Sequence, residues 1–104
     1  MTAQNPYVVF STVPSASQGR TIAKAILEAQ FASCVNVVPG IDSFFRWRGK
    51  IDYACERLLM IKTDKRRLKK LEAMIRKLHQ YEIPEIIGWP IAWGSKSYLN
   101  WLAE

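Results

Sequence analysis

The chain has 104 residues, 49% of them hydrophobic, and its 15 Lys and Arg residues outnumber its 9 Asp and Glu residues to give a formal net charge of +6. This length predicts a single domain, residues 1–104, whose core needs neither a disulfide nor a structural metal. The longest unbroken apolar runs are four residues, far below the roughly 20 that cross a bilayer, which excludes a membrane-spanning helix. Two cysteines, with no basic and then apolar leader before them, predict free thiols in a cytoplasmic protein.

The first third of the chain predicts a strand followed by a helix. Residues 7–10 are strand formers that we expect to be buried on both faces, and Pro14 should end the strand. Ser15 or Ser17 is placed to cap the helix, which should run to about Phe31. Its buried face is predicted by apolar residues that recur at helical spacing: Ile22, Ala23, Ile26 and Ala29.

Residues 34–62 predict a long β-hairpin that is kinked or bulged at Pro39 and Gly40. If Arg48 and Gly49 form a two-residue loop, the register of the two strands is fixed. Two cross-strand pairs follow, a cation–π contact of Trp47 with Lys50 and an aromatic pair of Phe44 with Tyr53.

The last third predicts a second helix, capped by Thr63 or Asp64 and ending near His79. We expect residues 82–87 to start a strand, because Pro84 favours a strand start or edge. Gly88 and Pro90 should break that strand, and residues 91–93 are a candidate for a further short one. A final helical turn or two after residues 94–95 should dock on the domain through its apolar residues Tyr98, Leu99, Trp101 and Leu102.

The predicted order is strand, helix, strand, strand, helix, strand, with a short C-terminal helix. Two crossovers around a hairpin form an α+β sandwich, an antiparallel sheet with both helices on one face. The strands carry apolar residues with little clean alternation, so the second face of the sheet also needs a cover. The simplest cover is another copy of the chain, which predicts a homo-oligomer.

Several segments closely resemble the signature segments of the CutA family, and they cover nearly the whole chain in the right order. They are residues 34–40 (CVNVVPG), 47–51 (WRGKI), Glu56 with 59–63 (LMIKT), 79–87 (HQYEIPEII) and 98–101 (YLNW). The resemblance implies a ferredoxin-like fold, a homotrimer held by contacts between sheets, and an association with tolerance of divalent cations, most often copper.

The resemblance also directs attention to metal ligands around His79. The ligands proposed for some bacterial members fall here on Ser11, Leu78 and His79, and only the histidine retains a metal-binding side chain, which argues against tight copper binding. His79 suits Cu²⁺ or Zn²⁺, and Glu82 is a second candidate ligand. The alternative is a histidine that caps the second helix without binding metal.

Six further residues are candidates for a cleft between subunits: Cys34, Trp47, Glu56, Lys62, Tyr81 and Glu85. Trp47, Lys62 and Tyr81 match signature positions of the family's suspected functional cleft. Each also has a structural alternative: Cys34 as a small buried apolar residue, Trp47 packed on a neighbour, and the charged residues in ion pairs across a trimer.

The residues predict no enzyme, because no catalytic constellation or phosphate-binding glycine loop accompanies the single histidine. Seven basic residues lie within residues 65–77, but they occupy the outer side of an amphipathic helix, so we expect a solvated face rather than a nucleic-acid partner. The leading hypothesis is a non-enzymatic trimer that requires no cofactor and binds divalent cations weakly. The alternative is a signalling or scaffolding trimer, like the PII regulators, that holds a small anionic ligand or a protein partner in its clefts.

Overall fold

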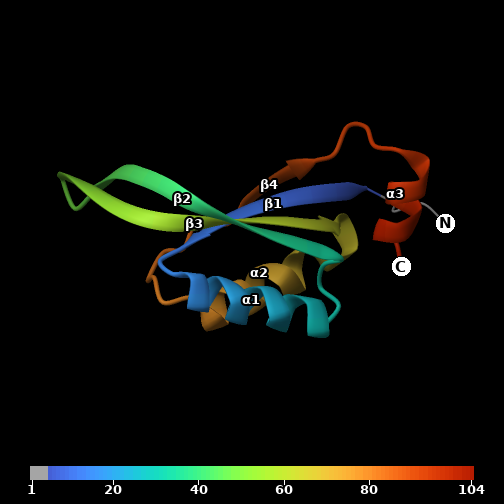
Figure 1. The fold of residues 1–104 in the computed structure, drawn as a ribbon, viewed down its shortest axis with the longest axis horizontal. Helices are drawn as coiled ribbons and strands as arrows, with labels where there is room; N and C mark the ends of the chain where they lie inside the picture. Colours follow the sequence, from blue (N-terminus) through green and yellow to red (C-terminus); the bar gives the residue numbers. More distant parts are fainter. Residues whose placement is uncertain (1–4) are drawn as a thin grey trace.

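The computed structural model describes residues 5–104 and shows a ferredoxin-like α+β fold, as predicted (Figure 1). Its elements are β1 (Pro6–Val13), α1 (Ala16–Glu28), β2 (Cys34–Trp47), β3 (Lys50–Asp64), the 3₁₀ turn η1 (Lys65–Arg67), α2 (Leu68–Leu78), β4 (Ile87–Pro90) and α3 (Lys96–Leu102). The four strands form one antiparallel sheet in the order β2-β3-β1-β4. Both α1 and α2 lie on the same face of this sheet (Figure 1).

The core lies between the sheet and these two helices. Val9, Ser11 and Val13 alternate along β1 and are buried on the helix side, whereas the residues between them are only partly buried. The prediction that residues 7–10 are buried on both faces was therefore wrong for this single chain, because no element within residues 5–104 covers the second face. We call that second face the open face of the sheet. Its central strands present mainly Val8, Phe10, Leu58 and Met60.

The hairpin has the predicted register. Arg48 and Gly49 form the loop with φ values of 50° and 78°, Trp47 pairs with Lys50, and Phe44 pairs with Tyr53. The Phe44 and Tyr53 ring centroids are 4.9 Å apart. The cation over the Trp47 ring is the Arg48 guanidinium, at 5.5 Å, rather than the expected Lys50.

The predicted irregularity at Pro39 and Gly40 is a shift in strand register between Val38 and Ile41. Gly40 has a φ of 75° there, which glycine adopts without strain. The shift reverses which residues of β2 face the helices: Val37 does so before it, and Phe44 does so after it, opposite Tyr53. The two halves of β2 thus follow opposite alternation patterns.

The segment after α2 differs most from the prediction. The strand starts at Ile87, not within residues 82–86, and residues 91–93 are not a strand. Gly88 lies inside β4 instead of breaking it, whereas Pro90 is the last residue of the strand, as predicted. An edge strand tolerates proline, and a Cβ at Gly88 would come within 2.8 Å of the Val8 carbonyl oxygen, so the close approach of β4 to β1 requires glycine.

The helix ends were predicted in part. Ser15 caps α1 and accepts a hydrogen bond from the Gln18 amide, but α1 ends at Glu28 rather than near Phe31. Gln30 follows with a φ of 63°, a conformation that stops a helix. Asp64 does not cap the second helix with its side chain, because its carboxylate binds two arginines and a 3₁₀ turn precedes α2.

The C-terminal helix docks on the domain, as expected. Ser95 caps it, and Leu102 is fully buried. The Leu102 carbonyl oxygen accepts hydrogen bonds from the Ser33 hydroxyl (2.7 Å) and from the Arg67 guanidinium (3.2 Å). The same Arg67 Nη2 is 3.3 Å from Oδ2 of Asp64, which is completely buried. Arg67 therefore links the end of β3, through an ion pair, to the C-terminal helix, through a hydrogen bond.

Charge is distributed unevenly over the two layers. The elements α1, η1 and α2, which we call the helix layer, hold nine of the fifteen basic residues and two of the nine acidic residues. The rest of the chain, with six basic and seven acidic residues, is close to neutral. Within residues 5–104, no helix combines the length and the apolar composition needed to span a membrane.

We expect Asp64→Asn to lower the free energy of unfolding at about pH 7 by about 3 kcal/mol, because it leaves the Arg67 guanidinium without its buried partner. Burial alone would raise the pKa of Asp64, but Arg66 and Arg67 outweigh it and hold that pKa below its usual value. The pair therefore stabilises the fold above the unfolded-state pKa of about 3.9 and is lost as the pH falls through the lower folded pKa.

Urea unfolding of both proteins between about pH 7 and pH 2 measures this difference, which should shrink as the pH falls. Glu72→Gln is the control, since it breaks an exposed pair with Arg76 (3.6 Å) and should change stability by less than about 0.5 kcal/mol. Equal effects of the two substitutions would contradict the role given to Asp64.

Candidate functional site

His79 ends α2 and holds the loop that follows through both nitrogens of its ring. Its Nε2 lies 2.7 Å from the Thr12 carbonyl oxygen, and its Nδ1 lies 3.1 Å from the Tyr81 amide nitrogen. An amide can only donate, so Nδ1 accepts this hydrogen bond and the proton on Nε2 goes to Thr12. His79 is thus a buried, neutral histidine in the C-cap position, and it joins the loop to β1.

The metal ligands predicted around His79 fit an ion poorly in this arrangement. The lone pair of Nδ1 is engaged, so His79 could ligate only after the Tyr81 amide is released. Glu82 lies in the exposed loop, with its carboxylate 3.7 Å from Arg48 Nη2 at the hairpin tip. Ser11 is fully buried with no partner for its hydroxyl, and Leu78 packs against the core.

Three of the predicted cleft residues meet where β1 ends. Glu56 is buried in β3, and its Oε2 accepts a hydrogen bond of 2.7 Å from the Tyr81 hydroxyl. Burial and this hydrogen bond raise the pKa of Tyr81 to about 12. Partial desolvation, followed by the charge of Glu56, raises the pKa of Glu85. The Tyr81 ring also packs on His79, with centroids 4.7 Å apart.

The other predicted cleft residues lie elsewhere in the chain. Lys62 is six residues along β3 from Glu56, a distance of roughly 20 Å. Its ammonium donates to the Asn36 side chain, and Cys34 is its cross-strand partner. Trp47 is at the hairpin tip. One chain therefore brings Glu56, Tyr81 and Glu85 together with His79 and places Lys62 far from Glu56. Trp47 stays at the hairpin tip, where its neighbour Arg48 reaches Glu82 of the same loop.

Sequence reasoning missed two polar clusters. Asn36, which receives the Lys62 ammonium, gave no signal beyond being a polar residue in an apolar strand. A second cluster lies on the hairpin, where Asp42, Tyr53 and Cys55 are linked by short contacts. The predicted pairing of Phe44 with Tyr53 already implied that Asp42 faces Cys55, because residues two apart on paired strands share a face.

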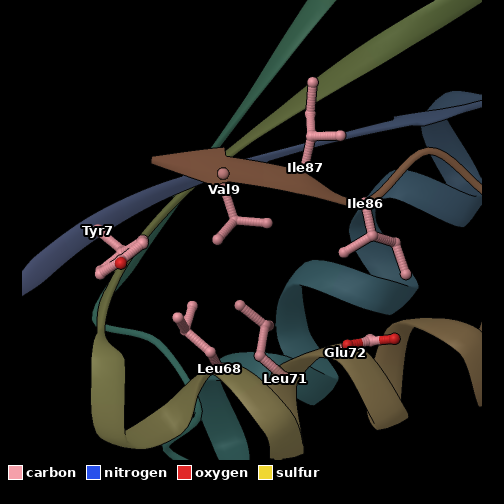
Figure 2. A pocket seen from close by; sticks show the side chains of 8 residues that line it. Tyr7, Val9, Leu68, Leu71, Glu72, Ile86 and Ile87 are labelled. Carbon is pink, nitrogen blue, oxygen red and sulfur yellow. The ribbon is translucent and has the colours of Figure 1, made fainter. Parts of the chain in front are cut away.

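A cavity of about 170 Å³ lies between the edge of the sheet and α2 (Figure 2). Figure 2 shows Val9 and Ile86 pointing toward Leu68 and Leu71 of the helix, whereas Ile87 points the other way. The walls are apolar except for Tyr7 and Glu72, and the Glu72 carboxylate already pairs with Arg76. None of the predicted site residues lines this cavity.

The comparisons with known proteins agree on one family. The family described as "CutA1 divalent ion tolerance protein" matches residues 7–104. The chain is 47% identical to "Divalent-cation tolerance protein CutA" of Thermus thermophilus, over 93% of this chain and 94% of that protein. It is 43% identical to "Protein CutA, chloroplastic" of Arabidopsis thaliana, over 91% of this chain but only 52% of that longer protein. The crystal structure of CutA1 from Oryza sativa superposes with a TM-score of 0.93 at 40% identity, over 97% of this chain and 92% of the other.

We expect Glu85→Gln to stabilise the fold at about pH 7 and to have little effect at about pH 4. When folding raises the pKa of a carboxyl group, the free energy of unfolding falls as the pH rises from the unfolded-state pKa to the folded-state pKa. Glutamine has no carboxyl group and therefore removes that loss. Urea midpoints at the two pH values measure the effect.

Glu82→Gln is the matched control, because it removes a carboxylate from the same loop and leaves the Glu56–Glu85 pair intact. A Glu85→Gln protein with the stability profile of the wild type would contradict the raised pKa of Glu85, whether desolvation or the charge of Glu56 is its cause.

Proposed function

The chain belongs to the CutA1 divalent ion tolerance family, and on that premise we propose that it acts in divalent-cation tolerance as a non-enzymatic homotrimer that binds divalent metal ions weakly. The observation that carries the assembly is the apolar open face of the sheet. Copper and zinc are the ions we consider first, since His79 and the two cysteines are ligands that suit them.

The open face supports self-association because it joins large apolar side chains from β1, β3 and β4. Phe10 and Trp89 stack on it with ring centroids 4.9 Å apart, while Trp89 and Ile87 remain 45% and 54% exposed. Patches of this kind mark interaction surfaces. Other copies of the chain are the proposed cover, because the face is apolar and the charge of the chain lies mostly on the helix layer.

Weak rather than tight metal binding follows from the ligands that one chain offers. Within residues 5–104, no three side chains of His, Cys, Asp or Glu gather in a way that could hold an ion. His79 would have to give up the Tyr81 amide before its Nδ1 could bind, and Glu82 would have to leave Arg48. Each exchange subtracts from the affinity.

The proposed compartment is the cytoplasm, although the Arabidopsis relative is named chloroplastic. Cys34 and Cys55 are free thiols. Cys34 pairs with Lys62, seven residues along β3 from Cys55, so the two cysteines lie roughly 23 Å apart, too far for a disulfide. An exposed free thiol such as Cys55 suits a reducing compartment.

We expect the wild-type chain to form trimers in solution and Met60→Lys to dissociate them, because the substitution places an unpaired charge in the middle of the open face. Leu27→Lys is the control, since Leu27 is 40% exposed on α1, away from that face. Sedimentation velocity and light scattering measure the assembly. A monomeric wild type, or a Met60→Lys trimer as stable as the wild type, would contradict the proposed cover.

The proposed function predicts that a host strain without a CutA family protein of its own grows better at raised concentrations of Cu²⁺ or Zn²⁺ when it expresses this chain. Equilibrium dialysis of the purified protein should show saturable but weak binding, with a dissociation constant in the micromolar range or above. Growth indistinguishable from the empty-vector control would refute the role in tolerance. Growth rescue without saturable binding would leave the role intact and refute direct binding.

A further inference from the structure

A cluster of three donor atoms on the hairpin lies outside every site considered above. The Tyr53 hydroxyl is 2.8 Å from Asp42 Oδ1 and 2.9 Å from Cys55 Sγ, and this sulfur is 3.8 Å from the same carboxylate oxygen. We propose that Asp42, Tyr53 and Cys55 form a binding site for a thiophilic divalent cation such as Zn²⁺. The proposal rests on the proposed function and assigns the weak metal binding to a particular place.

The spacing of the donors is close to that of ligands around one ion. With a sulfur at about 2.3 Å and oxygens at about 2.0 Å from a tetrahedral Zn²⁺, neighbouring ligand atoms lie about 3.3–3.5 Å apart. The Cys55–Asp42 distance is near that value, and the Tyr53 hydroxyl needs to move outward by only about 0.5 Å. All three side chains are exposed, so nothing packed above them opposes this movement.

The sheet holds the donors together without help from the ion. Asp42 and Cys55 are direct cross-strand partners, and Tyr53 lies two residues from Cys55 on the same face of β3. Preorganised donors on rigid strands lose little conformational freedom when an ion binds. The three donors leave at least one coordination position for water, so the site is open rather than closed.

Asp42 supplies the negative charge of the cluster and forms no salt bridge with a Lys or Arg of residues 5–104. A basic residue on the same face is Arg57, two residues along β3 from Cys55. Binding replaces the thiol proton with the metal and releases that proton to solvent.

The cluster is accessible in the single chain. Tyr53 and Cys55 lie on the same side of β3 as the buried Leu59 and Ile61, which is the side of the helices. The hairpin extends past the helices, so this side of its outer half is uncovered (Figure 1). Copies that cover the open face would lie on the opposite side of the sheet.

Cys34 provides a matched comparison within the same chain. It is partly buried, and its sulfur lies 3.9 Å from Asn36 Oδ1, which also receives the Lys62 ammonium. A positive charge beside a sulfur opposes cation binding. A general reaction of metals with thiols would involve both cysteines, whereas the proposed site involves Cys55 alone.

The test is titration of the purified full-length chain with Co²⁺ under reducing conditions, followed by displacement with Zn²⁺. We expect a saturable thiolate-to-cobalt charge-transfer band in the wild type and in Cys34→Ser, and its loss in Cys55→Ser. Asp42→Asn and Tyr53→Phe should weaken binding by about tenfold or more. Circular dichroism and light scattering establish that each variant keeps its fold and assembly.

Each other outcome overturns the proposal in a recognisable way. A band that survives in Cys55→Ser and disappears in Cys34→Ser would move the site to Cys34 and leave direct metal binding intact. If the band is lost in Cys55→Ser but Asp42→Asn and Tyr53→Phe do not weaken binding, the metal reacts with a single thiol and the three residues form no site. Absence of saturable binding by the wild type would reject both this site and direct metal binding, while rescue of growth would still test the tolerance role separately.

Discussion

The pairing of β3 with two neighbours at once is the constraint on which the rest of the structure depends. The backbone of β3 forms hydrogen bonds with β1 over residues 57–64. On its other edge, β3 pairs with β2 along almost the whole length of the strand. This double pairing fixes which side chains face the helices and which form the open face. It also carries β2 and β3 past the helices as a two-stranded ribbon, and the register shift at Gly40 keeps that ribbon paired. The polar clusters are therefore consequences of strand register, since β3 supplies Glu56, Lys62, Tyr53 and Cys55.

Strand order, hairpin register and the docking of the last helix could be predicted because short-range rules decide them. Alternation, the Arg48-Gly49 turn and the serine caps act over a few residues. The prediction failed where distant contacts decide. Residues 82–86 looked like the start of a strand, yet β1 offers β4 only four partners, Tyr7 to Phe10, and the preceding loop is held by His79 and Tyr81 instead. Gly88 signalled a break, but the edge of a sheet is a place where glycine is accommodated.

The candidate site shows the same division between what is local and what is distant. Residue type indicated that His79, Glu56, Tyr81 and Glu85 have chemistry worth examining, and the structure places them within one neighbourhood. Residue type could not indicate which hydrogen bonds already occupy them. His79 has the right ring for a metal, but the Thr12 carbonyl and the Tyr81 amide take both of its nitrogens, and neither partner can be recognised from the sequence because both are backbone groups. Ligand chemistry is a property of unoccupied lone pairs, and only the packed chain shows which lone pairs remain free.

The uneven distribution of charge has a consequence for particles larger than one chain. When copies meet through a nearly neutral, apolar surface, electrostatic repulsion hardly opposes the first association. In the proposed trimer the basic helix layers would lie on the outside, and two such particles would repel each other at close range. The same asymmetry would then favour a small closed assembly and discourage stacking into larger aggregates. Dissolved salt screens this repulsion within about 10 Å at 0.1 M. The chain's excess of lysine and arginine therefore acts mainly on the behaviour of the particles in solution and less on the fold.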